Sequence, residues 1–181
     1  MITYEVDRAD LKYVQEKLKG IEKGAPTAIM KAVNITAKAA RKKLQEGVNK
    51  SYTVKTGGFN SRMNIHNASR SRLYAVITSK GRPLTLTRFH ATAPKSGGKA
   101  DIVKAGLKQL VGSRNIKAFK RKGLMMQRET EDRYPIKVLR SNSVSKMLES
   151  VYKGKVNSAV EPVIQETLHS EIEKQVAKLT Q

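Results

Sequence analysis

The chain has 181 residues, 39% of them hydrophobic, which is enough for one core of ordinary size. It carries 36 lysines and arginines against 15 acids, for a formal net charge of +21, and no cysteine, which excludes disulfides and thiolate metal sites. No stretch approaches the roughly 18 consecutive apolar residues of a membrane helix, and the N-terminus has acids where a signal peptide has an apolar run, so we expect a cytosolic or cytosol-assembled protein.

The basic charge is concentrated in the middle of the chain. Residues 26–155 carry 29 bases and six acids, whereas residues 1–25 and 156–181 are close to neutral. A field of this size attracts polyanions, and nucleic-acid phosphate is the usual partner. A basic face that meets an acidic protein in an assembly explains the same charge, so composition leaves both partners open.

The N-terminal part of the chain predicts a short strand and two helices. Residues 2–6 alternate as a strand, and Asp7 is placed to cap a helix over about 8–20. Pro26 suits the first turn of a helix that runs to about residue 50 and has a basic outer surface. Its apolar stripe, expected to form core and subunit contacts, includes Ile29, Val33, Ala40 and Leu44.

The middle of the chain predicts short strands and a basic arm. The pair Gly57–Gly58 predicts a turn, and residues 63–66, 73–79 and 84–89 have strand character. Residues 90–123 contain nine bases and one acid after Ala93. Because a loop this long and charged is usually functional or disordered, we interpret it as a mobile basic arm at a sheet edge.

The C-terminal part predicts two strands followed by two helices. Residues 124–128 and 134–139 read as strands, the second an edge strand because a proline lies at its start. Residues 144–152 form an amphipathic helix, and residues 156–180 form another in which Pro162 marks a kink or a restart. The buried face of the last helix includes Leu168 and Ile172.

These elements predict a single α+β domain over residues 1–181. A mostly antiparallel sheet is packed by the long helix of the N-terminal half and by the C-terminal helices, with a long basic arm at residues 90–123.

The sequence shows no arrangement of residues that would support catalysis. The three histidines are not paired at ligand spacing, no serine lies in a nucleophile elbow, and no glycine pair precedes a Lys-Ser/Thr phosphate loop. The acids Glu129, Glu131 and Asp132 are interpreted as a solvated turn. We therefore expect a protein that is not an enzyme and uses no metal or cofactor; a hydrolase or nuclease is the weakest alternative.

A resemblance to a known family rests on three segments in order. The long helix carries the spacing Ala-x-Asn-x-Thr-Ala-x-x-Ala-Arg, at Ala32, Asn34, Thr36, Ala37, Ala40 and Arg41. The dipeptide Pro83-Leu84 with Phe89 follows, and then residues 118–121 lead to Pro135-Ile136. Together these segments resemble the minor tail protein Z family of tailed bacteriophages, although Tyr134 stands where that family usually has leucine.

The resemblance spans roughly residues 28–165 and implies a virion structural protein at the head-proximal end of the tail, assembled in the host cytoplasm. Such a protein completes the tail and joins it to the head. Related proteins form rings, often sixfold, so the implied partners are further copies, tail-tube and head–tail connector proteins, and duplex DNA in the lumen. A lumen accepts a duplex without reading its sequence.

The residues expected to face DNA or an acidic neighbour are all basic. They are Arg88, Lys95, Lys99, Lys104, Lys108, Lys117, Lys120, Arg121 and Lys122. The alternative function is that of a free, sequence-nonspecific nucleic-acid-binding protein, whose affinity for nucleic acid would fall steeply with salt.

Overall fold

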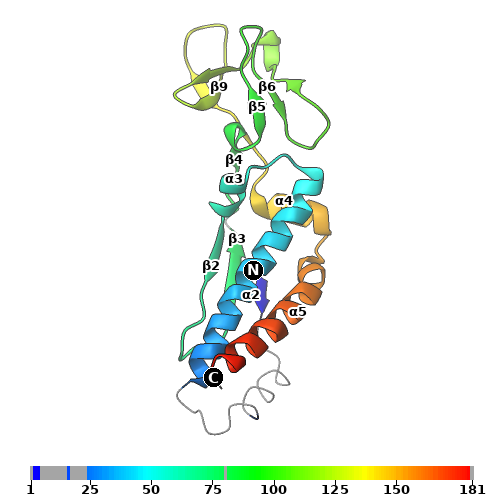
Figure 1. Ribbon diagram of the computed structural model, residues 1–181. Coiled ribbons are helices and arrows are strands. Elements are labelled where there is room, and N and C mark those ends of the chain that lie inside the picture. The colour runs from blue at the N-terminus through cyan, green and yellow to red at the C-terminus, as the bar shows by residue number, and fades with distance from the viewer. Residues whose placement is uncertain (1, 5–15, 17–23, 80, 180–181) are drawn as a thin grey trace. The chain divides into compact units, whose positions relative to one another are not determined.

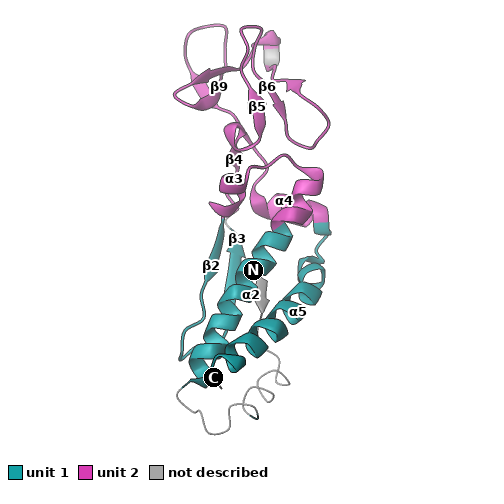
Figure 2. Cartoon of the chain, in the orientation of Figure 1, with its two compact units in different colours: residues 1–44, 63–79, 152–181 teal, residues 45–62, 80–151 magenta. Residues whose placement is uncertain are grey.

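The computed structural model describes residues 2–4, 16, 24–79 and 81–179. It confirms the α+β class: helices are combined with short strands that pair antiparallel in four small sheets (Figure 1). The chain divides into two compact units, which Figure 2 shows in separate colours. Unit 1 comprises residues 1–44, 63–79 and 152–181, and unit 2 comprises residues 45–62 and 80–151.

Unit 1 contains two long helices and one three-stranded sheet, in which β3 lies between β1 and β2. The strand expected at 63–66 and the long helix are confirmed, while the helix expected at 8–20 lies outside the described residues except for Glu16, which is helical. The elements are β1 (Ile2–Tyr4), α2 (Ala25–Ser51), β2 (Met63–His66), β3 (Ala75–Ser79) and α5 (Val156–Ala177). Helix α2 enters unit 2 at Gln45.

The core of unit 1 joins α2 to α5. One cluster of buried side chains includes Ile29 and Val33 of α2 together with Leu168 and Ile172 of α5. Full burial of one such aliphatic side chain stabilises the fold by about 1.5–3 kcal/mol. The six apolar residues expected in the helical core are all buried: Ile29, Val33, Ala40, Leu44, Leu168 and Ile172. Their expected part in subunit contacts stays a prediction.

Asn34 joins α2 to the loop after β2. Its Nδ2 donates to the Ala68 carbonyl at 3.2 Å, and its Oδ1 accepts from the Ala68 N–H at 2.7 Å. The side-chain amide therefore satisfies both polar groups of one residue 34 positions away, which a loop outside regular structure needs when it is partly buried. The asparagine of the Ala-x-Asn-x-Thr spacing is thus a tertiary contact.

Unit 2 contains three small sheets, with strand orders β10-β9-β8, β11-β4 and β5-β6-β7. Its first elements are α3 (Thr56–Asn60), β4 (Leu84–Thr85), the 3₁₀ turn η1 (Leu86–Arg88), β5 (His90–Thr92), β6 (Lys99–Asp101) and β7 (Lys108–Gln109). The rest are the turn η2 (Ser113–Asn115), β8 (Phe119–Arg121), β9 (Leu124–Arg128), β10 (Ile136–Val138), β11 (Arg140–Ser141) and α4 (Val144–Tyr152).

Two local predictions in unit 2 are wrong. The pair Gly57–Gly58 lies in helix α3, where a Cβ on Gly58 would stand 2.9 Å from the Arg88 Cβ, so that glycine permits close packing. The strand expected at 84–89 ends at Thr85 and gives way to η1. Leu86 and Phe89 are both buried, and a 3₁₀ turn aligns residues three apart whereas a strand would point them to opposite faces.

The segment 90–123 contains strands β5, β6, β7 and β8. A cluster of buried side chains, Leu86, Ala100, Ala118 and Met125, packs beneath these strands. A long basic arm is therefore not shown, and the segment is held in place by a small core of its own. Its expected mobility stays a prediction, as does the expectation of a single domain.

The predictions for the C-terminal part are largely confirmed. Strand β9 has the expected bounds, and β10 lies at the edge of its sheet. Helix α4 starts where expected because the Ser143 Oγ caps it, accepting from the Lys146 N–H at 3.2 Å. Helix α5 is continuous through Pro162, which is therefore not a restart.

The paired hydrogen bonds of Asn34 predict a large effect of truncation. Asn34→Ala leaves the Ala68 N–H and C=O without these partners and should lower the free energy of unfolding by about 1–3 kcal/mol. Lys31→Ala, a truncation of an exposed residue on the same helix, is the control and should change it by less than about 0.5 kcal/mol. Urea denaturation measures both; equal stability of the two variants would contradict the assigned role.

Candidate functional site

A cleft of about 840 Å³ lies within unit 2, beside the hairpin that leads into β8. Residues 93–97 form one part of its lining, residues 114–120 another, and the end of β9 with the following turn a third. Glu131 is its one acidic lining residue. Its five basic lining residues are Lys95, Arg114, Lys117, Lys120 and Arg128, which we call the cleft bases.

The hairpin that presents Arg114 is built by local backbone geometry. Val111 bridges to Lys117, and the Gly112 N–H donates to the Ile116 carbonyl at 2.9 Å. Arg114 and Asn115 both have left-handed backbones, with φ of 55° and 58°. Two successive residues with positive φ are typical of a tight hairpin turn, so Arg114 lies exposed at its tip.

Gln127 of β9 holds this hairpin in place. Its buried amide Nε2 donates to the Ile116 carbonyl at 2.7 Å. A Cβ on Gly112 would stand 2.9 Å from that Nε2, so the glycine leaves the space that the amide occupies. A buried polar side chain with one bonded partner therefore fixes the position of the turn relative to β9.

The wall of the cleft next to β8 is backed by close backbone packing. The Gly98 N–H donates to the Ala118 carbonyl at 2.6 Å, and the Leu110 N–H donates to the Gly98 carbonyl at 2.8 Å. A Cβ on Gly98 would stand 3.0 Å from the Ala118 Cβ and 3.2 Å from the Ala118 carbonyl oxygen, so glycine allows the two segments to pack this closely. The cleft bases next to it are thus carried by hydrogen-bonded strands.

The structure brings three of the nine predicted basic residues together in the cleft: Lys95, Lys117 and Lys120. The other six lie elsewhere in unit 2. Arg88 lies beside Gly58 of α3, and Lys99 is half-buried in β6. Lys104 follows β6 and Lys108 lies in β7, and both side chains are exposed. Arg121 ends β8, and Lys122 follows it in the turn to β9. That all nine face DNA or an acidic neighbour stays a prediction.

Sequence reasoning missed two of the cleft bases. Arg114 belongs to the basic segment but was not singled out, since nothing local marks the tip of its hairpin. Arg128 ends strand β9, where it pairs with Ile136 of β10, and only the antiparallel pairing of β8 with β9 brings this end of β9 back to the segment before β8, which carries Lys117. Arginine rarely adopts a positive φ, so the residue type gives no sign of the left-handed backbone at Arg114.

The cleft is chemically suited to bind a polyanion. All five cleft bases are exposed, and clustered like charges repel one another, a repulsion that an anion relieves. Arginine forks bind phosphate or carboxylate in a bidentate way, whereas lysines act as point charges. Because the bases are exposed, salt screens them, with a Debye length of about 8 Å at physiological ionic strength.

In the described part of the chain, no three histidine, cysteine, aspartate or glutamate side chains gather where they would hold a metal ion. Among the described helices, none is both long and apolar enough to cross a membrane. The acids of the turn at 129–132 are exposed, and Thr130 Oγ1 contacts the Asp132 carboxylate at 3.4 Å.

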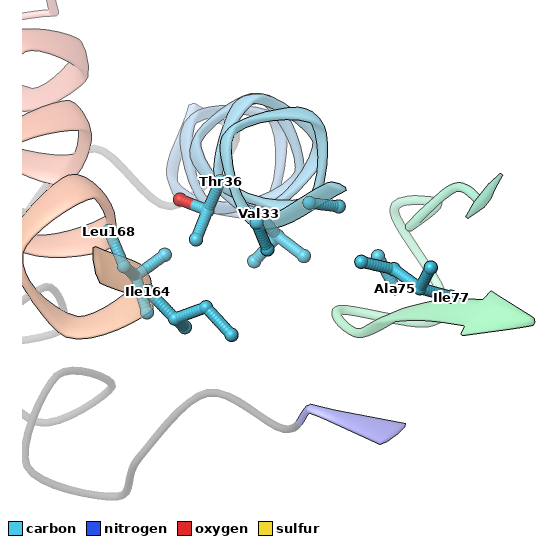
Figure 3. A pocket seen from close by; sticks show the side chains of 8 residues that line it. Val33, Thr36, Ala75, Ile77, Ile164 and Leu168 are labelled. Carbon is cyan, nitrogen blue, oxygen red and sulfur yellow. The ribbon is translucent and has the colours of Figure 1, made fainter. Parts of the chain in front are cut away.

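A small apolar pocket lies in unit 1 among α2, α5 and β3 (Figure 3). Its volume of about 20 Å³ is room for about one water molecule. Thr36 is its one polar lining residue, and the Thr36 Oγ1 is buried with no hydrogen-bond partner among the described residues. The pocket is a packing gap left by small side chains, because Ala37, Ala40 and Ala75 line it.

Comparison with known proteins identifies the family. The family described as prophage minor tail protein Z (GPZ) matches residues 11–181, nearly the whole chain. The chain belongs to this family. No curated protein and no solved structure matches it. The resemblance found in the sequence is confirmed, and membership of the minor tail protein Z family gives the protein a structural role in the phage tail, among other structural proteins of the virion.

Thr36 offers a test of the packing gap in this minor tail protein. Thr36→Val keeps the shape of the side chain and removes the hydroxyl that has no partner, so it should raise the free energy of unfolding by about 1 kcal/mol. Thr36→Ser keeps the hydroxyl and removes a methyl group, and it should lower that free energy by about 1 kcal/mol. Thermal denaturation compares them; a destabilised valine variant would show that the hydroxyl is bonded.

Proposed function

We propose that this protein completes the phage tail at its head-proximal end and joins the tail to the head. In this proposal it acts without catalysis or cofactor, as one subunit of a ring around the path of the DNA. The family supplies the tail role, and the cleft bases are the observation that supports a place beside DNA. A ring repeats one cleft in every subunit and so surrounds the duplex with positive charge.

The chemistry of the cleft matches what a DNA passage requires. Duplex DNA carries one negative charge per about 1.7 Å of its axis, and contacts to phosphate position a protein without reading sequence. The cleft bases are exposed side chains, of which Lys120 and Arg128 lie in the paired strands β8 and β9 and Arg114 lies at the tip of a hairpin, and they need no base-reading helix. Such contacts suit a passage through which DNA of any sequence must pass.

The second candidate function is free, sequence-nonspecific binding of nucleic acid. The observation that favours it is that the cleft lies within one unit of one chain and needs no second copy to form. This function predicts tight binding of duplex DNA by dilute monomer, with log affinity falling linearly with log salt concentration. The proposed tail role instead predicts that strong DNA contact appears on the assembled tail.

Charge reversal in the cleft tests the proposed function. Lys117→Glu, Lys120→Glu and Arg128→Glu together should lower the yield of joined particles at least about tenfold, because loss of only about 1.4 kcal/mol of binding has that effect. The measurement is complementation of phage that lacks this protein, with free heads and free tails counted by electron microscopy.

A matched variant controls for net charge. Lys50→Glu, Lys137→Glu and Lys146→Glu change three exposed residues of unit 2 that lie outside the cleft lining and outside the nine predicted contact residues, and particle yield should stay near wild type. Wild-type yield from the cleft variant would overturn the role of the cleft in joining. A cleft variant that blocks joining yet leaves the affinity of assembled tails for duplex DNA unchanged would assign the cleft to an acidic protein neighbour.

A further inference from the structure

The two long helices of unit 1 carry charges of opposite sign. From Ala25 to Leu44, α2 has five bases and no acid. Helix α5 has four acids and one base. The helices share one core through their apolar faces, so their charged faces point away from it. One compact unit therefore has a basic helical face and an acidic helical face.

The basic face has a regular stripe opposite the core. Lys31, Ile35 and Lys38 are exposed and follow one another at i, i+4 and i+7, which places them on one line along α2. In the described part of the chain, no ion pair joins either lysine to an acid. Ile35 is 39% exposed, an apolar side chain between two cations. We call these three residues the basic stripe.

The acidic face has a stripe of the same length. Glu166, His169 and Glu173 are exposed and follow at i, i+3 and i+7 on α5. The His169 Nε2 lies 3.4 Å from the Glu173 carboxylate, within the helix. We call these three residues the acidic stripe. Each stripe has its two charges seven residues apart, which is roughly 10 Å along a helix, so the two patterns match in spacing.

We propose that the basic stripe of one copy docks on the acidic stripe of the next copy, which makes it the contact between neighbouring subunits. The inference rests on the ring of the proposed function and names its interface. Lys31 and Lys38 then meet Glu166 and Glu173, and Ile35 is covered at the centre of the contact. Contact of either stripe with itself places like charges face to face, which disfavours such pairings.

The charge pattern determines orientation more than strength. Exposed ion pairs contribute little each, but complementary charge selects the partner and its register. Two different patches on one chain make a head-to-tail contact, and such a contact forms a closed ring when its rotation closes. In this proposal the basic stripe lies in the contact between subunits. The cleft bases of unit 2 are different residues, and they contact the polyanion.

A charge swap tests this interface. Lys31→Glu with Lys38→Glu makes both stripes acidic, and Glu166→Lys with Glu173→Lys makes both basic. Each variant alone should self-associate at least about tenfold more weakly than wild type, because like charges then face each other. An equimolar mixture should assemble, since each variant supplies the charge that the other lacks, and the variant with all four changes should also assemble. Light scattering, alone and on purified tails, measures assembly.

The results of the charge swap distinguish failure of the stripe docking from failure of the ring. Variants that assemble as wild type does, or a mixture that fails to assemble, overturn the docking of the stripes while the ring stands. A wild type that stays monomeric even on purified tails overturns the ring and the docking together, whereas the joining assay on the cleft variants still decides tail completion. Lys137→Glu with Lys146→Glu makes the same charge change as the basic-stripe variant on exposed residues of unit 2, controls for net charge and should assemble normally.

Cross-linking gives an independent readout, because the chain has no native cysteine. A chain with Ile35→Cys and His169→Cys together should give a ladder of covalent oligomers with a thiol cross-linker. The two single-cysteine chains should give covalent dimers only when they are mixed. Dimers from either single-cysteine chain alone would show like faces in contact and overturn the proposal. Circular dichroism checks that each variant keeps the wild-type fold.

Discussion

The packing of the inner face of α2 against its neighbours is the constraint on which unit 1 depends. This face is buried and combines aliphatic side chains with small ones, among them Ala32, Ala37 and Ala40. Alanine loses no side-chain entropy in a helix, so its burial there costs little. Asn34 adds directed bonds at the edge of this packing, where the loop after β2 must be held. The motif that marks the family is therefore a packing motif.

Once the inner face of α2 is apolar, its charges lie on the outside. The same holds in unit 2, where a small core of Leu86, Ala100, Ala118 and Met125 supports strands that carry basic residues outward. Among the described residues, the cleft bases and the lysines of the basic stripe thus lie on exposed side chains outside the buried cores. In the proposals made above, the charge of unit 1 orders neighbouring copies, and the charge of unit 2 contacts a polyanion. Both uses need only charge held at fixed spacing, which short strands and long helices provide.

In the proposed role, a place in the phage tail accounts for a strongly basic chain whose sequence shows no base-reading motif. A protein that joins tails to heads meets the same neighbours whatever genome the head contains, so recognition of bases would serve no purpose. Phosphate contacts are general, because every nucleotide carries the same charge. In the proposals for this protein, the cleft bases and the two stripes make contacts of this general kind, in which spacing and sign matter more than shape.

Periodicity by itself determined the long elements of this protein. Apolar residues that repeat with the period of a helix or of a strand predict α2, α4, α5, β2 and β9. This signal lies in residues that are close together in the chain. The family was also visible in the sequence, in the order of three segments, of which the spacing of Asn34 and Thr36 on one helix is the first. Tertiary structure alone decided that Leu86 and Phe89 share a 3₁₀ turn, and that Arg114 and Arg128 join Lys95, Lys117 and Lys120 in one cleft. Those residues meet through strand register and a buried Gln127, and such long-range pairing leaves no repeat in the sequence that local reasoning can detect.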